Sequence, residues 1–399
     1  MERIAGGVTA PEGYLAAGVA CGLKKDGRPD LALLVSEYPA VAAGVFTTNQ
    51  VKGHSLLLTQ RRIDRPVRAV LVNSGNANAC LGPRGDKDAE AAAAFAARAL
   101  SLAEEEVLFA STGVIGQPLD LAALERGVFL ARENLSPRGG GEAARAIMTT
   151  DTFPKEAAVR LRLGGRVIHI GGMAKGAGMI HPNLATLLGF LTTDAPVERE
   201  ALATALRAAV ETSFNAVTVD GDTSPCDMVI ALANGAVGGA PIAAGTEDFS
   251  LFTAALTEVA RELAKMVARD GEGATKLLTI IVRGARNEAE ARRIGRAVGV
   301  SPLVKTAVFG ADANWGRILS AVGNAGIPVA PAKVRIEIGG VLVCEEGRAV
   351  PFSEEEAKAA LLRREVEIAI DLGLGQAEAT VWSCDLTYDY IKINGSYRS

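Results

Sequence analysis

Short apolar segments alternate with longer alanine-rich segments along most of this 399-residue chain. The apolar segments have the length of β-strands, and the alanine-rich segments repeat apolar side chains at helical spacing. This alternation predicts an α/β protein in which helices pack in layers on sheets. The predicted strands are residues 31–36, 67–72, 107–110, 167–171, 229–233, 277–282, 334–338 and 366–372.

Two predicted helices, residues 88–102 and 249–269, repeat alanine and leucine along one face. Each is preceded by an aspartate that can cap its first turn, Asp86 or Asp248. The continuous apolar face of the second helix is typical of a helix that packs on a core. We therefore expect both helices to be scaffold.

The helix and strand pattern restarts after residue 283, with predicted helices at residues 286–298 and 353–365. The chain is also long enough for two or three domains. We therefore predict a boundary near Gly284, which separates a larger domain of residues 1–284 from a smaller α/β domain of residues 285–399.

Composition excludes several classes of partner. The chain has 42 Lys and Arg residues against 46 Asp and Glu residues, so no excess positive charge is available for a nucleic-acid backbone. No segment approaches the ~20 apolar residues of a membrane helix, and residues 13–23 lack the basic leader of a secretory signal. We expect a cytoplasmic globular protein without nucleic-acid or membrane partners.

The cysteines and histidines argue against disulfides and zinc. The cysteines are odd in number, lie far apart and form no CxxC pair, so reduced thiols are expected. They are Cys21, Cys80, Cys226, Cys344 and Cys384. The three histidines, His54, His169 and His181, form no HExxH motif or Cys/His pair, so we expect chemistry without a metal.

Polar, glycine-rich loops are the expected place for a functional site, because glycine lets backbone approach a ligand closely. In one of them, "VDGDTS", Asp220 and Asp222 could bind a metal, but a turn stabilised by aspartate side chains fits better. The other loops are "NSGNANAC", "STGVIG", "GGMAKGAGMI", "RDGEGATK" and "FGADANWGR".

Two common chemistries do not fit these loops. The glycines of "GGMAKGAGMI" follow a predicted strand, but their spacing matches neither GxGxxG nor a P-loop. A Ser-His-Asp hydrolase needs a histidine base, and no histidine stands in a recognisable setting such as that of a GxSxG partner. Nucleotide binding and serine hydrolysis are both disfavoured.

The stretch "NLATLLGF" offers a nucleophile that needs no histidine. Thr186 follows the small residue Ala185, so its hydroxyl could attack the preceding carbonyl in an N-to-O acyl shift, and hydrolysis would then free its α-amine. An α-amine has a pKa of about 7.7–8.0 and can act as a base at neutral pH. The alternative is that Thr186 caps a buried helix at residues 187–191.

The run "KGAGMIHPNLATLLGFLTTDA" resembles the self-cleavage and active-site segment of the glutamate N-acetyltransferase (ornithine acetyltransferase) family of arginine biosynthesis. Further blocks resemble that family in the same order, so the resemblance covers nearly the whole chain. They are "STGVIG", "MTTDTFPK", "SFNAVTVDGDTSPCD", "GEGATK", "GADANWGRI" and "INGSYRS". The resemblance implies a layered αββα sandwich of the ornithine acetyltransferase and aminopeptidase/amidase type, with a smaller α/β C-terminal domain that contributes to the active site.

The resemblance also implies a role for individual residues. The chain would cut itself between Ala185 and Thr186, and Thr186 would be the nucleophile that accepts the acetyl group and contacts the substrate. Thr112 and Gly113 match the pair that forms the oxyanion hole, where a hydroxyl and a backbone N–H can donate to a developing alkoxide. The alternative for this pair is a turn after the strand.

Five further positions match residues that bind the amino-acid substrate: Thr152, Lys175, Glu272, Asn394 and Ser399. An ammonium, a carboxylate and neutral hydrogen-bonding groups suit an acetylated amino acid. The alternative for Lys175 and Glu272 is a structural salt bridge between them. The family often ends in threonine, so serine at the last position departs from its pattern, and the cysteine of "SPCD" is expected to pack rather than react.

The resemblance implies transfer of the acetyl group of N-acetylornithine to glutamate by a ping-pong route, without cofactor or metal. It leaves open whether acetyl-CoA is a second donor. The two fragments are expected to remain together as α and β chains of an α2β2 heterotetramer. The alternatives are an aminopeptidase/amidase-type hydrolase of the same fold and a non-catalytic ligand-binding protein.

Overall fold

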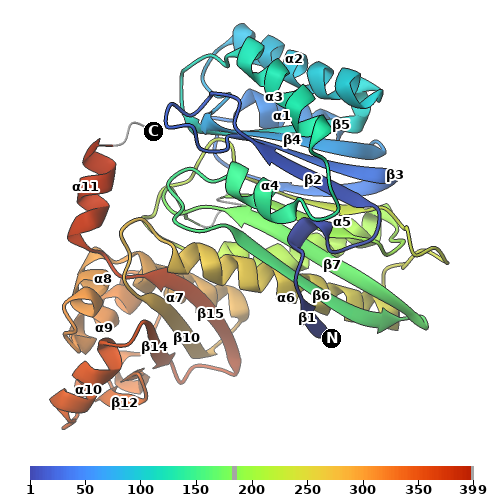
Figure 1. Ribbon diagram of the computed structural model, residues 1–399. Helices are drawn as coiled ribbons and strands as arrows, with labels where there is room; N and C mark the ends of the chain where they lie inside the picture. The colour runs from blue at the N-terminus through green and yellow to red at the C-terminus, as the bar shows by residue number, and fades with distance from the viewer. Residues whose placement is uncertain (182–186, 397–399) are drawn as a thin grey trace.

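The computed structural model describes residues 1–181 and 187–396. Ala185, Thr186 and Ser399 therefore lie outside the described residues. Within them, the chain forms a large two-sheet unit followed by a smaller unit with a sheet of its own (Figure 1). None of the helices in these two ranges combines the length and the apolar run that crossing a membrane requires.

Strand β3 (Leu31–Phe46) is long enough to join both sheets of the large unit. Its first part pairs with β2 (Tyr14–Val19) and β4 (Val67–Asn76), and its last part pairs with β9 (Met228–Ala233). The sheet order is β1-β6-β7-β8-β9-β3-β4-β5, with β2 beside β3. The remaining strands are β1 (Glu2–Ile4), β5 (Val107–Val114), β6 (Lys155–Leu163), β7 (Arg166–Lys175) and β8 (Leu188–Thr193).

Helices cover the outer faces of the two sheets (Figure 1). Helices α1 and α2 pack on β5, and α3 packs on β2 and β3; on the other side, α5 packs on β3 and β9, and α6 packs on β6 and β7. A shorter helix, α4, fills part of the space between the sheets. Their bounds are α1 (His54–Arg62), α2 (Pro83–Leu100), α3 (Leu121–Glu133), α4 (Gly140–Ala146), α5 (Arg199–Glu211) and α6 (Glu247–Arg269).

Alternating side chains along the strands produce this layering, because successive residues of a strand point to opposite faces. On β4, Val70 and Val72 join the core between the sheets, whereas Leu71 packs outward in the core with α2 and α3. On β9, Ile230 points to the inner core and Ala231 to the core with α5 and α6. The predicted αββα sandwich is confirmed.

Strand β8 overturns one alternative. A helix at residues 187–191, capped by Thr186, is wrong, because Leu188–Thr193 is a strand between β7 and β9. All six of its residues are buried. A strand buried on both faces is apolar throughout and lacks the alternation that distinguishes a strand from a helix.

The predicted helix caps are also wrong. Helix α2 begins at Pro83 after Gly82, and Asp86 lies inside its first turn. Helix α6 begins at Glu247, and the Thr246 side chain accepts the hydrogen bond from the backbone N–H of Phe249. Capping needs an oxygen just before the first turn, and an aspartate inside that turn instead favours the helix dipole.

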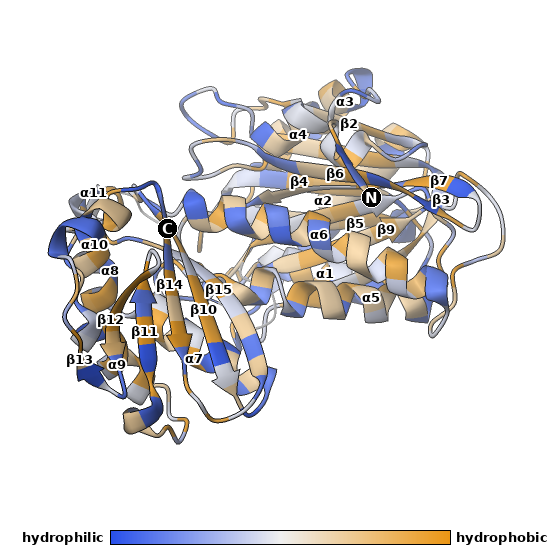
Figure 2. Cartoon of the chain, turned by 90° about the horizontal axis from the view of Figure 1, so that it is seen from below, coloured by the Kyte–Doolittle hydropathy of each residue, from blue (hydrophilic) through white to orange (hydrophobic). Residues whose placement is uncertain are grey.

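The smaller unit has a six-stranded sheet in the order β13-β12-β11-β14-β10-β15. Hydrophilic and hydrophobic residues alternate along β11 and β14 (Figure 2). The predicted boundary at Gly284 falls inside β10, a strand of this sheet. The strands are β10 (Leu277–Ala285), β11 (Arg335–Ile338), β12 (Val341–Glu345), β13 (Arg348–Ala349), β14 (Glu365–Asp371) and β15 (Ala377–Cys384).

The final helix, α11 (Tyr388–Ser396), leaves the smaller unit and extends toward the open end of the sandwich (Figure 1). None of its described residues is buried, so it lies on the surface. The other helices of this unit are α7 (Glu288–Val300), α8 (Pro302–Phe309), α9 (Trp315–Gly323) and α10 (Glu354–Leu361). Single-turn helices occur at Gly7–Thr9, Glu104–Glu106, Phe214–Ala216 and Pro331–Lys333.

Candidate active site

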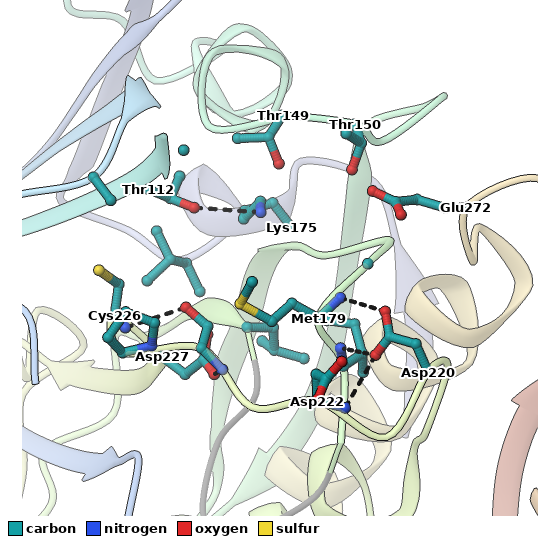
Figure 3. A pocket seen from close by; sticks show the side chains of 18 of the residues that line it. Thr112, Thr149, Thr150, Lys175, Met179, Asp220, Asp222, Cys226, Asp227 and Glu272 are labelled. Carbon is teal, nitrogen blue, oxygen red and sulfur yellow. Dashed lines mark hydrogen bonds between the residues drawn. The ribbon is translucent and has the colours of Figure 1, made fainter. Parts of the chain in front are cut away.

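A small polar cavity of about 200 Å³ lies where the ends of β5 and β7 meet the loop before β9 and helix α11. Figure 3 shows Thr112, Lys175 and Glu272 along one side of it and Asp220, Asp222 and Asp227 along the other. The side chains of four predicted site residues line this cavity, and the backbone of Gly113 lines it as well. The four are Thr112, Lys175, Glu272 and Asn394.

Thr112 and Gly113 lie near the end of β5, paired with Ser74 and Gly75 of β4 in a parallel ladder. Gly113 has φ +129°, and a Cβ atom there would lie 2.5 Å from the carbonyl carbon of Gly75. Only glycine tolerates both conditions. The close approach of the two strands therefore fixes the Gly113 backbone next to Thr112 on the cavity wall.

Lys175 is the last residue of β7 and is 9% exposed. Its Nζ donates a long hydrogen bond of 3.4 Å to the Thr112 hydroxyl. No ion pair joins it to Glu272 in the described part of the chain, so the predicted alternative of a salt bridge between them has no support. Its ammonium group faces the cavity, where it can receive a carboxylate.

Asp227 and Cys226 form the wall opposite Lys175. The Asp227 carboxylate accepts a hydrogen bond from the backbone N–H of Ser224 at 3.0 Å, and burial raises its pKa well above the usual value. Burial likewise raises the pKa of the Cys226 thiol to about 12. Cys226 packs with Ala77 and is not ionised near neutral pH, which matches its expected packing role.

Glu272 and Asn394 meet at the rim, where Asn394 Nδ2 donates a 2.7 Å hydrogen bond to Glu272 Oε2. Glu272 is 8% exposed, and its carboxylate lies against Gly178, where a Cβ atom would be 2.4 Å away. The carboxylate keeps acceptor capacity on the cavity side. It can therefore receive an ammonium group of a substrate.

Asp220 holds the loop after β7 through its carboxylate. It accepts hydrogen bonds from the backbone N–H groups of Met179 at 2.6 Å and Ile180 at 2.9 Å, and from that of Asp222 at 3.3 Å. This is the aspartate-stabilised turn that "VDGDTS" predicts. In the described ranges, no three His, Cys, Asp or Glu side chains are grouped to hold a metal ion.

Thr152 is the predicted binding residue that the cavity wall does not include. It is exposed, its hydroxyl donates to Asp270, and its N–H donates to the same carboxylate at 3.0 Å. The neighbouring Thr149 and Thr150 line the cavity instead. Sequence reasoning also missed Asp227, the last residue of the block "SFNAVTVDGDTSPCD", and Tyr390, which precedes the block "INGSYRS". Neither carries a local pattern that marks a role.

The predicted nucleophile and cleavage pair, with the C-terminal Ser399, lie outside the described residues. The two residues that follow Thr186 in the chain, Leu187 and Leu188, both line the cavity. The backbone N–H of Met228 donates to the carbonyl of Leu187 at 2.9 Å. The chain therefore enters β8 at the cavity, next to Asp227.

The arrangement provides a hydroxyl, an ammonium group and several carboxylates around a small volume, which suits a zwitterionic amino acid. The ArgJ family model matches residues 15–399 of this chain. The chain belongs to the ArgJ family. The resemblance read from the motifs is thus confirmed.

ArgJ relatives match this chain from end to end. The "Arginine biosynthesis bifunctional protein ArgJ" of Symbiobacterium thermophilum is 52% identical over 402 residues, covering 100% of both chains. The ArgJ protein of Bacillus subtilis is 44% identical and covers 100% of this chain and 98% of its own. The crystal structure of ArgJ from Bacillus halodurans matches with 43% identity and a TM-score of 0.50, covering 52% of this chain and 97% of that one.

Proposed function

We propose that this ArgJ-family chain transfers the acetyl group of N2-acetyl-L-ornithine to L-glutamate, after it cuts itself between Ala185 and Thr186. One observation carries the proposal: the cavity gathers Thr112, Gly113, Lys175 and Glu272 around Leu187, the residue bonded to Thr186. A threonine with a free α-amine placed there would have its base, its oxyanion donors and its substrate contacts within one site.

Self-cleavage is the first step. The Thr186 hydroxyl attacks the Ala185 carbonyl, the peptide C–N bond breaks, and the acyl group moves from nitrogen to oxygen. Water then hydrolyses the ester, leaving a carboxylate on Ala185 and a free amine on Thr186. The solved Bacillus halodurans ArgJ chain matches over 97% of its own length but covers 52% of this chain, so it is comparable in length to one fragment of the proposed cut.

Acetyl transfer uses the same hydroxyl. Thr186 Oγ1 attacks the acetyl carbonyl of N-acetylornithine, and its own amine takes the hydroxyl proton. The Thr112 hydroxyl and the Gly113 N–H donate to the oxyanion. The amide C–N bond then breaks, ornithine leaves with the proton on its amine, and the acetyl group remains as an ester on Thr186.

Glutamate completes the cycle when its amine attacks the acetyl carbonyl of this ester. The bond between the acetyl carbon and Thr186 Oγ1 breaks, and the proton lost by the glutamate amine passes through the Thr186 α-amine to Oγ1, which restores the hydroxyl. Both substrates carry an α-carboxylate, which the Lys175 ammonium can receive, and ornithine adds a distal ammonium, which the Glu272 carboxylate can receive. We include Thr152, Asn394 and Ser399 among the substrate contacts. This chemistry requires no cofactor or metal.

The name of the relatives includes the word bifunctional, and we include acetyl-CoA as a second donor in the proposal. A thioester would acetylate Thr186 by the same attack, with the thiol as leaving group. We also propose that the two fragments remain together as α and β chains of an α2β2 assembly in the cytoplasm.

One experiment tests the core of the proposal. The protein is mixed with N-acetylornithine without glutamate, quenched, and the fragment that begins at Thr186 is weighed. One added acetyl group on Thr186, discharged when glutamate is added, is the expected result. Continuous release of acetate without glutamate would identify a hydrolase instead, and intersecting-line kinetics with no acetylated fragment would reject the covalent route.

A further inference from the structure

Three buried charged side chains meet beneath the cavity, with Lys155 between two aspartates. Lys155 Nζ lies 2.7 Å from Asp151 Oδ1 and 2.5 Å from Asp270 Oδ2. Lys155 is fully buried and both aspartates are 5% exposed. Within this group of three, two carboxylates share one ammonium where solvent does not screen their charges.

Asp151 joins two walls of the cavity through its remaining acceptor sites. Its Oδ1 also accepts a hydrogen bond from the backbone N–H of Gly176 at 2.7 Å, directly after Lys175. Its Oδ2 accepts from the N–H of Thr149 at 2.9 Å. A single carboxylate therefore connects the end of β7 to the turn that carries Thr149 and Thr150.

Asp270 extends this network to a third wall. It follows α6 and accepts hydrogen bonds from both the N–H and the hydroxyl of Thr152. Glu272, which lines the cavity, is two residues further along the chain. Lys155 precedes the proposed cut and Asp270 follows it, so their contact also crosses the two fragments.

The charges around Asp151 come from several elements. Burial acts to raise the pKa of Asp151, but the ammonium groups of Lys155 on β6 and Lys175 on β7 outweigh it and hold the pKa well below the usual value. Lys24, whose Nζ donates to the carbonyl of Met148 at 2.7 Å, faces the same carboxylate. Asp151 thus stays an anion with its hydrogen bonds directed at backbone.

We infer that Asp151 is a positioning residue for acetyl transfer: its carboxylate, held by Lys155, keeps Lys175 and the Thr149–Thr150 turn in the geometry that binds substrate. The inference rests on the proposed function. Asp151 does not contact the reacting atoms in this scheme and takes no proton. Its effect reaches the substrate through Lys175.

The first test is Asp151→Asn, which keeps the size of the side chain but removes its charge and one acceptor. Misplacement of Lys175 should lower kcat/KM for N-acetylornithine on the order of 100-fold, with KM rising more than kcat falls. The matched control is Asp385→Asn. Asp385 is also buried and accepts from the N–H groups of Thr275 and Lys276 at 2.8 and 2.9 Å, but neither partner lines the cavity, whereas the Asp151 partner Thr149 does.

The second test is Lys155→Met, which keeps the Asp151 carboxylate and remains informative where Asp151→Asn fails to fold. Without the Lys155 charge, burial should raise the pKa of Asp151, so the carboxylate becomes protonated as the pH falls. We expect a new acid limb in the pH profile of kcat/KM that wild type and Asp385→Asn lack. A purely structural loss would lower activity equally at every pH.

The outcomes separate the inference from the function on which it rests. Wild type and Asp385→Asn without any acetyl transfer would overturn the proposed function. The positioning role alone would be overturned if wild type and control are active and Asp151→Asn has an unchanged KM. It would also be overturned if they are active and Lys155→Met lacks the acid limb. Fragment patterns on a denaturing gel show whether each variant has been cut.

Discussion

Asn394 donates a 2.7 Å hydrogen bond to Glu272 across 122 residues of sequence. Glu272 lies in the loop between the two units, and Asn394 lies on the surface helix α11. The bond therefore fastens the final helix to the rim of the cavity. Tyr390 of the same helix adds a weaker contact, a 3.4 Å hydrogen bond from its hydroxyl to Asp220.

Asn394→Ala should raise KM for N-acetylornithine, because Glu272 loses the donor that orients its carboxylate. A hydrogen bond to a charged group contributes about 1.5–3 kcal/mol, which corresponds to roughly a 10- to 150-fold change in binding. A double-mutant cycle with Glu272→Gln measures the coupling from KM values. Strictly additive effects of the two substitutions would show that the bond does not matter for binding.

Thr186→Ala removes both the attacking hydroxyl and the acyl shift, so we expect an uncut, folded and inactive chain. Wild type should give fragments of 185 and 214 residues on a denaturing gel, the second beginning Thr-Leu-Leu-Gly. Thr186→Ser keeps the hydroxyl and should still cut. Normal turnover by the alanine variant would place the nucleophile elsewhere, with Lys175 the next candidate.

Thr112→Ala should act mainly on turnover. An oxyanion donor is used most strongly in the transition state, and loss of one typically costs ~10²–10³ in kcat. Lys175→Ala is the contrasting variant, because a residue that binds the unreactive part of the substrate should act mainly through KM. Steady-state kinetics of both variants test whether Thr112 acts on kcat and Lys175 on KM. A Thr112→Ala variant with unchanged kcat would contradict the role assigned to Thr112.

The thiols provide a test that does not depend on activity. Cys80 is exposed, whereas burial raises the pKa of both Cys226 and Cys21 to about 12. At about pH 8 a thiol of that pKa is ionised only on the order of 10⁻⁴ of the time, and only the thiolate reacts. Brief treatment of native protein with iodoacetamide should therefore label Cys80, with Cys226 labelled only after denaturation. Mass spectrometry of the fragments reads the result, and rapid labelling of native Cys226 would contradict the described burial.

The sequence predicted the parts of the fold whose pattern is local. The predicted helix at residues 249–269 corresponds to α6, because one apolar face repeats along its whole length. The predicted strand at residues 229–233 corresponds to β9, a short apolar run between the polar residues Asp227 and Asn234. Strand β8 was misread, since a central strand is apolar on both faces and its neighbours are set by pairing with distant segments. Strand β6 was missed because charged residues interrupt its outer face.

For the site, the motifs predicted which sequence blocks contribute residues, but not which side chain of each block lines the cavity and which is buried behind it. The block "MTTDTFPK" led to the prediction of Thr152 as a binding residue. The buried residue of that block that connects the cavity walls is Asp151, which forms an ion pair with Lys155 at the end of the block. The role of Asp151 depends on Asp270, more than a hundred residues away, and no spacing within one block reveals such a pairing. Thr112, Lys175 and Glu272 came from separate blocks, and the fold places all three around one cavity.

Strands β7 and β8 pair in register from Ile170 opposite Thr193 to Lys175 opposite Leu188. Since β7 precedes the proposed cut and β8 follows it, the mature sheet would be shared by two polypeptides. Unfolding then becomes dissociation, so the melting temperature should depend on protein concentration and the lifetime on the rate at which the fragments separate. Such a protein folds first as a single uncut chain. After the cut, refolding from the unfolded state requires two separate fragments to associate, so it is no longer a unimolecular reaction.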